Sequence, residues 1–187
     1  MEKNKLIIET ALKLFVENGF HGTATSKIAQ ESGIANGTLF NYFSTKEILI
    51  VSIYNTVVKK MDDFIMESIE SNSVSKESFR LLFIASVKWN LENRMEFQYL
   101  QQFNNSPYSK NAITRVLNQE EHPLYNLIQN GINLVLVKPI AVGLVFSLFT
   151  AQINGLYYYL ITNNIAKNES MELIEETFEL LWEMIKD

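Results

Sequence analysis

Polar side chains that can form hydrogen bonds gather in one short stretch of the sequence, residues 36–41. Asn36, Gly37, Thr38 and Asn41 would give a helix a short, polar, hydrogen-bonding surface. A surface of this kind can enter the major groove of DNA, where base edges present donors and acceptors. The chemistry that these residues offer is recognition, in which no covalent bond is made or broken.

Enzyme chemistry has few candidate residues in this chain. The sequence contains no cysteine, and its 2 histidines are His21 and His122. We find no nucleophile paired with a base and no Gly-rich phosphate loop. Glu120 and Glu121 precede His122, but adjacent residues on a helix point in different directions and do not form a metal site. We therefore expect no enzyme activity, no catalytic residue, no metal and no cofactor.

The spacing within residues 25–43 fits a helix-turn-helix. Ala29 is small where two helices cross closely, and Gly33 stands where the tight turn favours a positive φ. Four apolar side chains would hold the second helix against the first: Ile28, Ile34, Leu39 and Tyr42. A helical hairpin with a structural role only is the alternative, and the polar surface of residues 36–41 favours DNA recognition instead.

The hydrophobic periodicity is helical along nearly the whole chain of 187 residues, with only 7 glycines and 3 prolines to interrupt it. We expect an all-α fold of about nine helices, with an N-terminal three-helix bundle over residues 1–47 and a larger helical domain over residues 48–187. The predicted helices span residues 3–18, 26–31, 36–43, 46–69, 76–93, 96–104, 110–131 with a break at Pro123, 139–162 and 171–186.

Helix ends have their own sequence signals. Gly19 is the predicted stop of the first helix, because glycine adopts the left-handed backbone that often follows a helix. Thr25, Thr45 and Ser75 are predicted N-caps, since their hydroxyl oxygens can accept a bond from a free backbone N–H.

Charge and hydropathy bear on where in the cell the protein is located. The net charge is −5, but residues 1–47 contain equal numbers of lysines and glutamates, so the deficit lies in the remainder. Residues 140–161 are apolar enough to suggest a membrane span. The alternative, which we favour, is a helix buried between its own core and a partner subunit. The N-terminus lacks a signal peptide, so we expect a cytoplasmic protein with no membrane partner.

Residues 19–49, GFHGTATSKIAQESGIANGTLFNYFSTKEIL, resemble the signature of the TetR family of repressors. The shared features are a glycine-aromatic step, an Ile-Ala pair, a glycine turn, a Gly-Thr-Leu-aromatic run and a closing Lys-Glu pair. The resemblance implies that Thr25, Ser26 and Lys27 meet phosphates and that residues 36–38 and Asn41 face base edges. Tyr42 and Lys46 would return to the DNA backbone. Phe40 replaces a tyrosine whose hydroxyl usually reaches phosphate.

The resemblance also implies a homodimer formed by the last two helices and a pocket for a small effector. The candidate interface residues are Phe146, Ile153, Tyr157, Phe178, Leu181 and Trp182. The candidate pocket residues are Phe83, Trp89, Phe97, Gln98, Gln102, Phe103, Tyr125, Phe149 and Gln152, although such large side chains can also simply fill a core.

These features together predict a ligand-responsive repressor. It would bind double-stranded, palindromic operator DNA as a dimer and be released by a mostly apolar effector. The alternative is a helical protein-interaction adaptor that does not bind DNA specifically.

Overall fold

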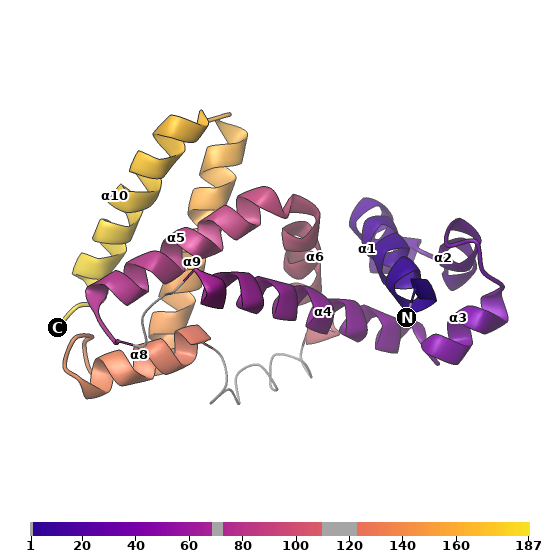
Figure 1. Ribbon diagram of the computed structural model, residues 1–187, viewed down its shortest axis with the longest axis horizontal. Coiled ribbons are helices and arrows are strands. Elements are labelled where there is room, and N and C mark those ends of the chain that lie inside the picture. The colour runs from indigo at the N-terminus through magenta and orange to yellow at the C-terminus, as the bar shows by residue number, and fades with distance from the viewer. Residues whose placement is uncertain (1, 69–72, 110–122) are drawn as a thin grey trace. The chain divides into compact units, whose positions relative to one another are not determined.

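A computed structural model describes residues 2–68, 73–109 and 123–187 of the chain. Within these ranges the chain forms helices and no strand, which confirms the all-α prediction (Figure 1). The helices are α1 (Glu2–Gly22), α2 (Thr25–Glu31), α3 (Asn36–Tyr42), α4 (Lys46–Glu67), α5 (Lys76–Glu92), α6 (Arg94–Asn104), α8 (Pro123–Asn133), α9 (Val142–Thr162) and α10 (Lys167–Ile185). The helix predicted over residues 110–131 is seen from Pro123 onward as α8; its earlier part lies outside the described residues.

The described residues divide into two compact units that do not follow chain order. The first unit includes residues 2–60 and 93–109, which comprise α1 to α3, most of α4, and α6. The second contains the other described residues, with the end of α4, α5 and α8 to α10. The boundary predicted after Glu47 remains a prediction about the DNA-binding domain, and the compact unit that holds those residues is larger.

Helix α1 turns its apolar face into the core of the first unit. The side chains predicted to share this face are at most 1% exposed: Ile7, Ala11, Leu14 and Phe15. At Gly19, the predicted stop, the backbone has φ 72° and ψ 166°, which is not helical. The helical assignment resumes and runs to Gly22, so glycine breaks the helix at the predicted position and one further turn follows.

Two of the three predicted N-caps are present. A backbone N–H of α4 donates to Thr45 Oγ1 at 3.2 Å, and one of α5 donates to Ser75 Oγ at 3.3 Å. The prediction for Thr25 is wrong, because α2 begins at Thr25 itself and Ala24 occupies the N-cap position. Alanine has no side-chain oxygen, so the start of α2 has no side-chain cap.

Aromatic rings fill the interior of the second unit, where α9 packs against α5, α8 and α10. The rings of Phe83 and Phe149 meet edge to face with centroids 5.6 Å apart. The ring centroid of Phe178 lies 5.9 Å from that of Phe83, and the same ring stacks on Trp182 with centroids 6.2 Å apart. All four side chains are buried, so α10 is held to α5 and α9 mainly by apolar surface removed from water.

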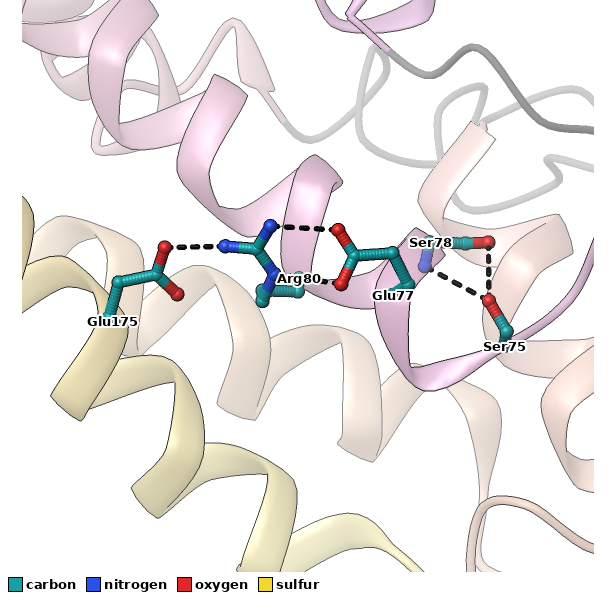
Figure 2. Close-up of polar contacts among 5 residues, drawn as sticks. All are labelled: Ser75, Glu77, Ser78, Arg80 and Glu175. Carbon is teal, nitrogen blue, oxygen red and sulfur yellow. Dashed lines mark hydrogen bonds and ion pairs between the residues drawn. The ribbon is translucent and has the colours of Figure 1, made fainter.

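Arg80 adds a polar link between α5 and α10. Its Nε and Nη2 atoms donate to the Glu77 carboxylate at 2.8 and 2.7 Å, and Nη1 donates to Glu175 (Figure 2). The hydrogen bonds with Glu77 and Glu175 raise the pKa of Arg80, and the bond from Arg80 lowers the pKa of Glu77. A second ion pair, Lys76 with Glu179 at 2.7 Å, joins the same two helices.

Candidate nucleic-acid interface

Helices α2 and α3 form the two arms of the predicted helix-turn-helix. Ile28, Ala29 and Leu39 are at most 2% exposed, so these side chains bring the two arms into the small core. Between the arms, Gly33 has a φ of 65°, in the left-handed region that glycine adopts without steric penalty. The Ile34 N–H donates to the Ala29 carbonyl oxygen at 3.0 Å and closes the turn. The turn therefore has the geometry that the spacing predicted.

The face of α3 that points away from Leu39 is open. Its exposed members are Asn36, Gly37, Phe40, Asn41 and Tyr42, and Thr38 beside them is half-buried. Within the described part of the chain, a Cβ added at Gly37 would meet no heavy atom within 4 Å, so nothing described there covers the middle of this face. The structure thus gathers the predicted base-contacting residues on one accessible surface.

Tyr42 does not seal the core as one of the four predicted apolar contacts. Its side chain is 42% exposed, whereas Phe43, the next residue, is 4% exposed. The reason is that α3 ends at Tyr42, and Phe43 adopts an extended backbone with φ −136° and ψ 99°. The exposed phenol hydroxyl of Tyr42 is therefore available to accept or donate a hydrogen bond, as the predicted contact with the DNA backbone requires.

The predicted phosphate contacts lie on the neighbouring helix starts. Ser26 and Lys27 in the first turn of α2 are exposed, and Thr25 is half-buried. Lys27 pairs with Glu31 at 3.8 Å, but an exposed pair of this kind is weak enough to exchange for a phosphate. Lys46 is the first residue of α4, where backbone N–H groups and the helix dipole also favour an anion.

Two hydrogen bonds that the sequence did not predict join helix α6 to the other helices of the first unit. The hydroxyl of Tyr99, which is fully buried, donates to the Ile50 carbonyl oxygen of α4 at 2.8 Å. Gln102 Nε2 donates to the Val16 carbonyl oxygen of α1 at 3.0 Å. Burial raises the pKa of Tyr99, so its hydroxyl stays protonated as a donor. The available signal was the spacing of Tyr99 and Gln102, which places both polar groups on one helix face.

The variant Tyr99→Phe is expected to lower the free energy of unfolding by about 1 kcal/mol. The substitution removes the bond to Ile50 but keeps the ring that meets Phe20 edge to face, with centroids 5.5 Å apart. Urea denaturation followed by circular dichroism measures the change. Tyr42→Phe, at a side chain of the same unit that is 42% exposed, is the matched control. Equal stability of both variants would show that the buried hydrogen bond contributes nothing.

The candidate pocket residues are divided between the two units. Phe97, Gln98, Gln102 and Phe103 belong to the first unit, and Phe83, Trp89, Tyr125, Phe149 and Gln152 belong to the second. Gln98 is exposed, and Phe103 stacks on Tyr54 of α4 with ring centroids 4.1 Å apart. At Gln102 the side-chain oxygen is buried without a hydrogen-bond partner in the described part of the chain. Membership of a pocket stays a prediction for all nine residues.

Most of the candidate interface residues are buried in the interior of the second unit. Five of them are at most 7% exposed, namely Ile153, Tyr157, Phe178, Leu181 and Trp182, and Phe146 is half-buried. Their side chains are buried within this one chain, and their place at a dimer interface stays a prediction. The large apolar side chains that the same helices expose are Leu144, Tyr158 and Tyr159 on α9 and Leu180 and Met184 on α10. This exposed set is a second candidate for an interface beside the six predicted residues.

The glycine turn and the open polar face of α3 define a helix-turn-helix DNA-binding protein. A family model described as "Bacterial regulatory proteins, tetR family" matches residues 7–53. The solved structure of a TetR family transcription regulator from Shewanella sp. PV-4 superposes with a TM-score of 0.88 at 28% identity, covering 99% of this chain and 98% of that one. The chain is therefore similar to the TetR family of regulators over residues 7–53, and over its whole length to a TetR family transcription regulator of known structure.

Two further proteins are similar to this chain. The fatty acid metabolism regulator protein of Bacillus subtilis (strain 168) is 33% identical over 76 residues, which cover 41% of this chain and 39% of that protein. The match therefore spans less than half of that relative. The structure of the transcriptional regulator FadR from Bacillus subtilis in complex with stearoyl-CoA has the same fold, with a TM-score of 0.76 at 22% identity. It covers 95% of this chain and 97% of that chain.

Proposed function

We propose that this protein is a cytoplasmic repressor that binds a palindromic operator as a homodimer and releases it when a small, mostly apolar effector binds. The observation that carries the proposal is the open polar face of α3, presented by a turn of the correct geometry. The proposed DNA contacts are Thr25, Ser26, Lys27, Asn36, Gly37, Thr38, Phe40, Asn41, Tyr42 and Lys46.

Dimerisation is part of the proposal because one helix-turn-helix reads only a short half-site, whereas two related by symmetry read an inverted repeat. Helix α9 offers a surface for this purpose. It is apolar and long enough to cross a membrane, which is weak evidence for a span. Only 33% of its most apolar stretch is buried within the chain. One stripe of exposed residues without charge runs along it: Leu144, Ser147, Ala151, Gly155 and Tyr158. A second copy of the chain would cover this stripe together with Leu180 and Met184.

Leu180→Glu is expected to raise the dissociation constant of the homodimer at least about tenfold. Leu180 is 71% exposed, so the substitution leaves the core intact. The symmetry of a dimer places two new carboxylates at the interface, where each must lose water. Sedimentation equilibrium measures the change. Leu134→Glu, at a leucine that is 59% exposed outside α9 and α10, is the control and should leave association unchanged. Equal association of both variants would remove this face from the interface.

The first effector to test is chosen from the relatives. One of them is a fatty acid metabolism regulator, and another is seen in complex with stearoyl-CoA. An effector releases DNA only if it binds the DNA-free state more tightly than the DNA-bound state. Stearoyl-CoA is therefore the first probe for release of a bound operator, with free coenzyme A as its control.

The test of DNA binding begins with selection of a site from a random double-stranded library by the wild-type protein, followed by fluorescence anisotropy on that site. Lys46→Ala should weaken binding by a similar factor on every sequence and reduce the slope of log affinity against log salt by about 1 per subunit. Lys13→Ala, on the exposed surface of α1, is the matched control. Failure to select any salt-sensitive site would contradict the repressor and favour the adaptor.

A further inference from the structure

Phe40 is an apolar ring on a polar recognition surface. It is 41% exposed on α3, while Leu39 beside it is fully buried. Its exposed neighbours on the same face, Asn36 and Asn41, carry amide side chains that can form hydrogen bonds. Contact between this apolar ring and water is unfavourable. A bound partner that covers the ring therefore gains free energy.

The surroundings of Phe40 leave room for a base edge. Gly37 precedes it by three residues, so the two positions are neighbours on the helix surface. Because a Cβ at Gly37 would meet no atom of the described residues within 4 Å, the backbone there is uncovered among them and DNA can approach it closely. Asn41, the next residue on this face, has the side-chain type that pairs with adenine through N6 and N7. An A·T pair presents such an adenine together with its thymine.

The chemistry of the ring decides which part of DNA it can recognise. Phenylalanine has no donor for a phosphate oxygen and no partner for a base amide or carbonyl. In the major groove, the apolar group that distinguishes one base from the others is the 5-methyl of thymine. Contact with this methyl group removes apolar surface from water on both sides.

We propose that Phe40 reads the 5-methyl group of one thymine in each half-site of the operator. This inference rests on the proposed DNA-binding function and adds a sequence preference to it. Phe40 is then a specificity-determining residue that acts through an apolar contact, and the tyrosine hydroxyl of the related sequences is not needed for this role.

The test uses the full-length protein and the site that the wild type selects from a random library. Each thymine of one half-site is replaced in turn by deoxyuridine, which removes only the methyl group, and affinity is measured by anisotropy. At one position the wild type should lose about fourfold in affinity, the value expected for one buried methyl group. Phe40→Ala should bind the thymine and deoxyuridine sites equally at that position. Phe40→Tyr, which keeps the ring, should retain the sensitivity.

Three outcomes are distinguishable. Loss of methyl sensitivity in Phe40→Ala alone supports the inference. Equal binding of the wild type to every deoxyuridine site overturns it while leaving the repressor proposal in place, because the site was still selected. If Phe40→Ala keeps the full sensitivity, another residue reads the methyl group, and the inference is again overturned. Circular dichroism checks that the variants are folded, which the exposure of Phe40 leads us to expect.

Discussion

Gly37→Leu is expected to lower operator affinity by about 100-fold or more while leaving the fold intact. The position lies in the middle of the open face of α3, and a Cβ added there would meet no heavy atom of the described residues within 4 Å, so the new side chain starts in open space in the free protein. Leucine also favours a helix more than glycine does. In the complex, however, the side chain would stand between α3 and the groove and separate Asn36 and Asn41 from the bases in both half-sites.

The comparison that isolates this effect uses a second exposed position in the same unit. Asn55→Leu on α4 introduces the same side chain away from the face of α3. Anisotropy on the selected site should show near wild-type affinity for this variant, and thermal denaturation should show both variants folded. A Gly37→Leu protein that binds the operator as tightly as the wild type would mean that α3 does not enter the groove.

Phe178→Ala is expected to lower the free energy of unfolding by about 3–5 kcal/mol. The ring is fully buried and contacts Phe83 and Trp182, so its removal leaves a cavity among side chains that cannot all collapse into it. The loss is a large share of the stability of a domain of this size. Urea denaturation at one fixed protein concentration measures it, because the proposed dimerisation would make apparent stability depend on concentration.

Leu134→Ala serves as the control for this measurement. Leu134 is 59% exposed and belongs to the same unit, so its truncation should change the free energy of unfolding by less than about 0.5 kcal/mol. A loss below about 1 kcal/mol in Phe178→Ala would show that this side chain is not part of a packed core. It would also favour the predicted place of Phe178 at a dimer interface.

The helix-turn-helix could be predicted closely because its requirements are local. A helix-turn-helix requires a small residue, a glycine in the turn and an apolar contact at fixed offsets along the chain. Ala29, Gly33 and Leu39 have these roles in the structure. The end of α3 was harder, because periodicity alone continued the helix to Phe43. One residue less of helix exchanged the exposure of Tyr42 and Phe43.

The faces of α9 and α10 could not be assigned in the same way. Helix α9 is apolar on most of its surface, so the sequence pattern indicates burial without showing which side meets its own subunit. On α10 the sequence pattern assigned Phe178 and Leu181 to an interface, and both side chains are buried within the same chain. The bond between Tyr99 and Ile50 joins residues 49 positions apart, a pairing that hydrophobic periodicity does not encode.

The inclusion of α6 in the first unit has a consequence for synthesis on the ribosome. The residues that complete this unit, 93–109, are made only after all of α5 has been translated. Until then, rings such as Phe15, Phe20 and Tyr54 lack the aromatic partners that α6 supplies. Because the N-terminal part of a nascent chain usually folds first, we expect an interval in which this apolar surface is uncovered and open to chaperones.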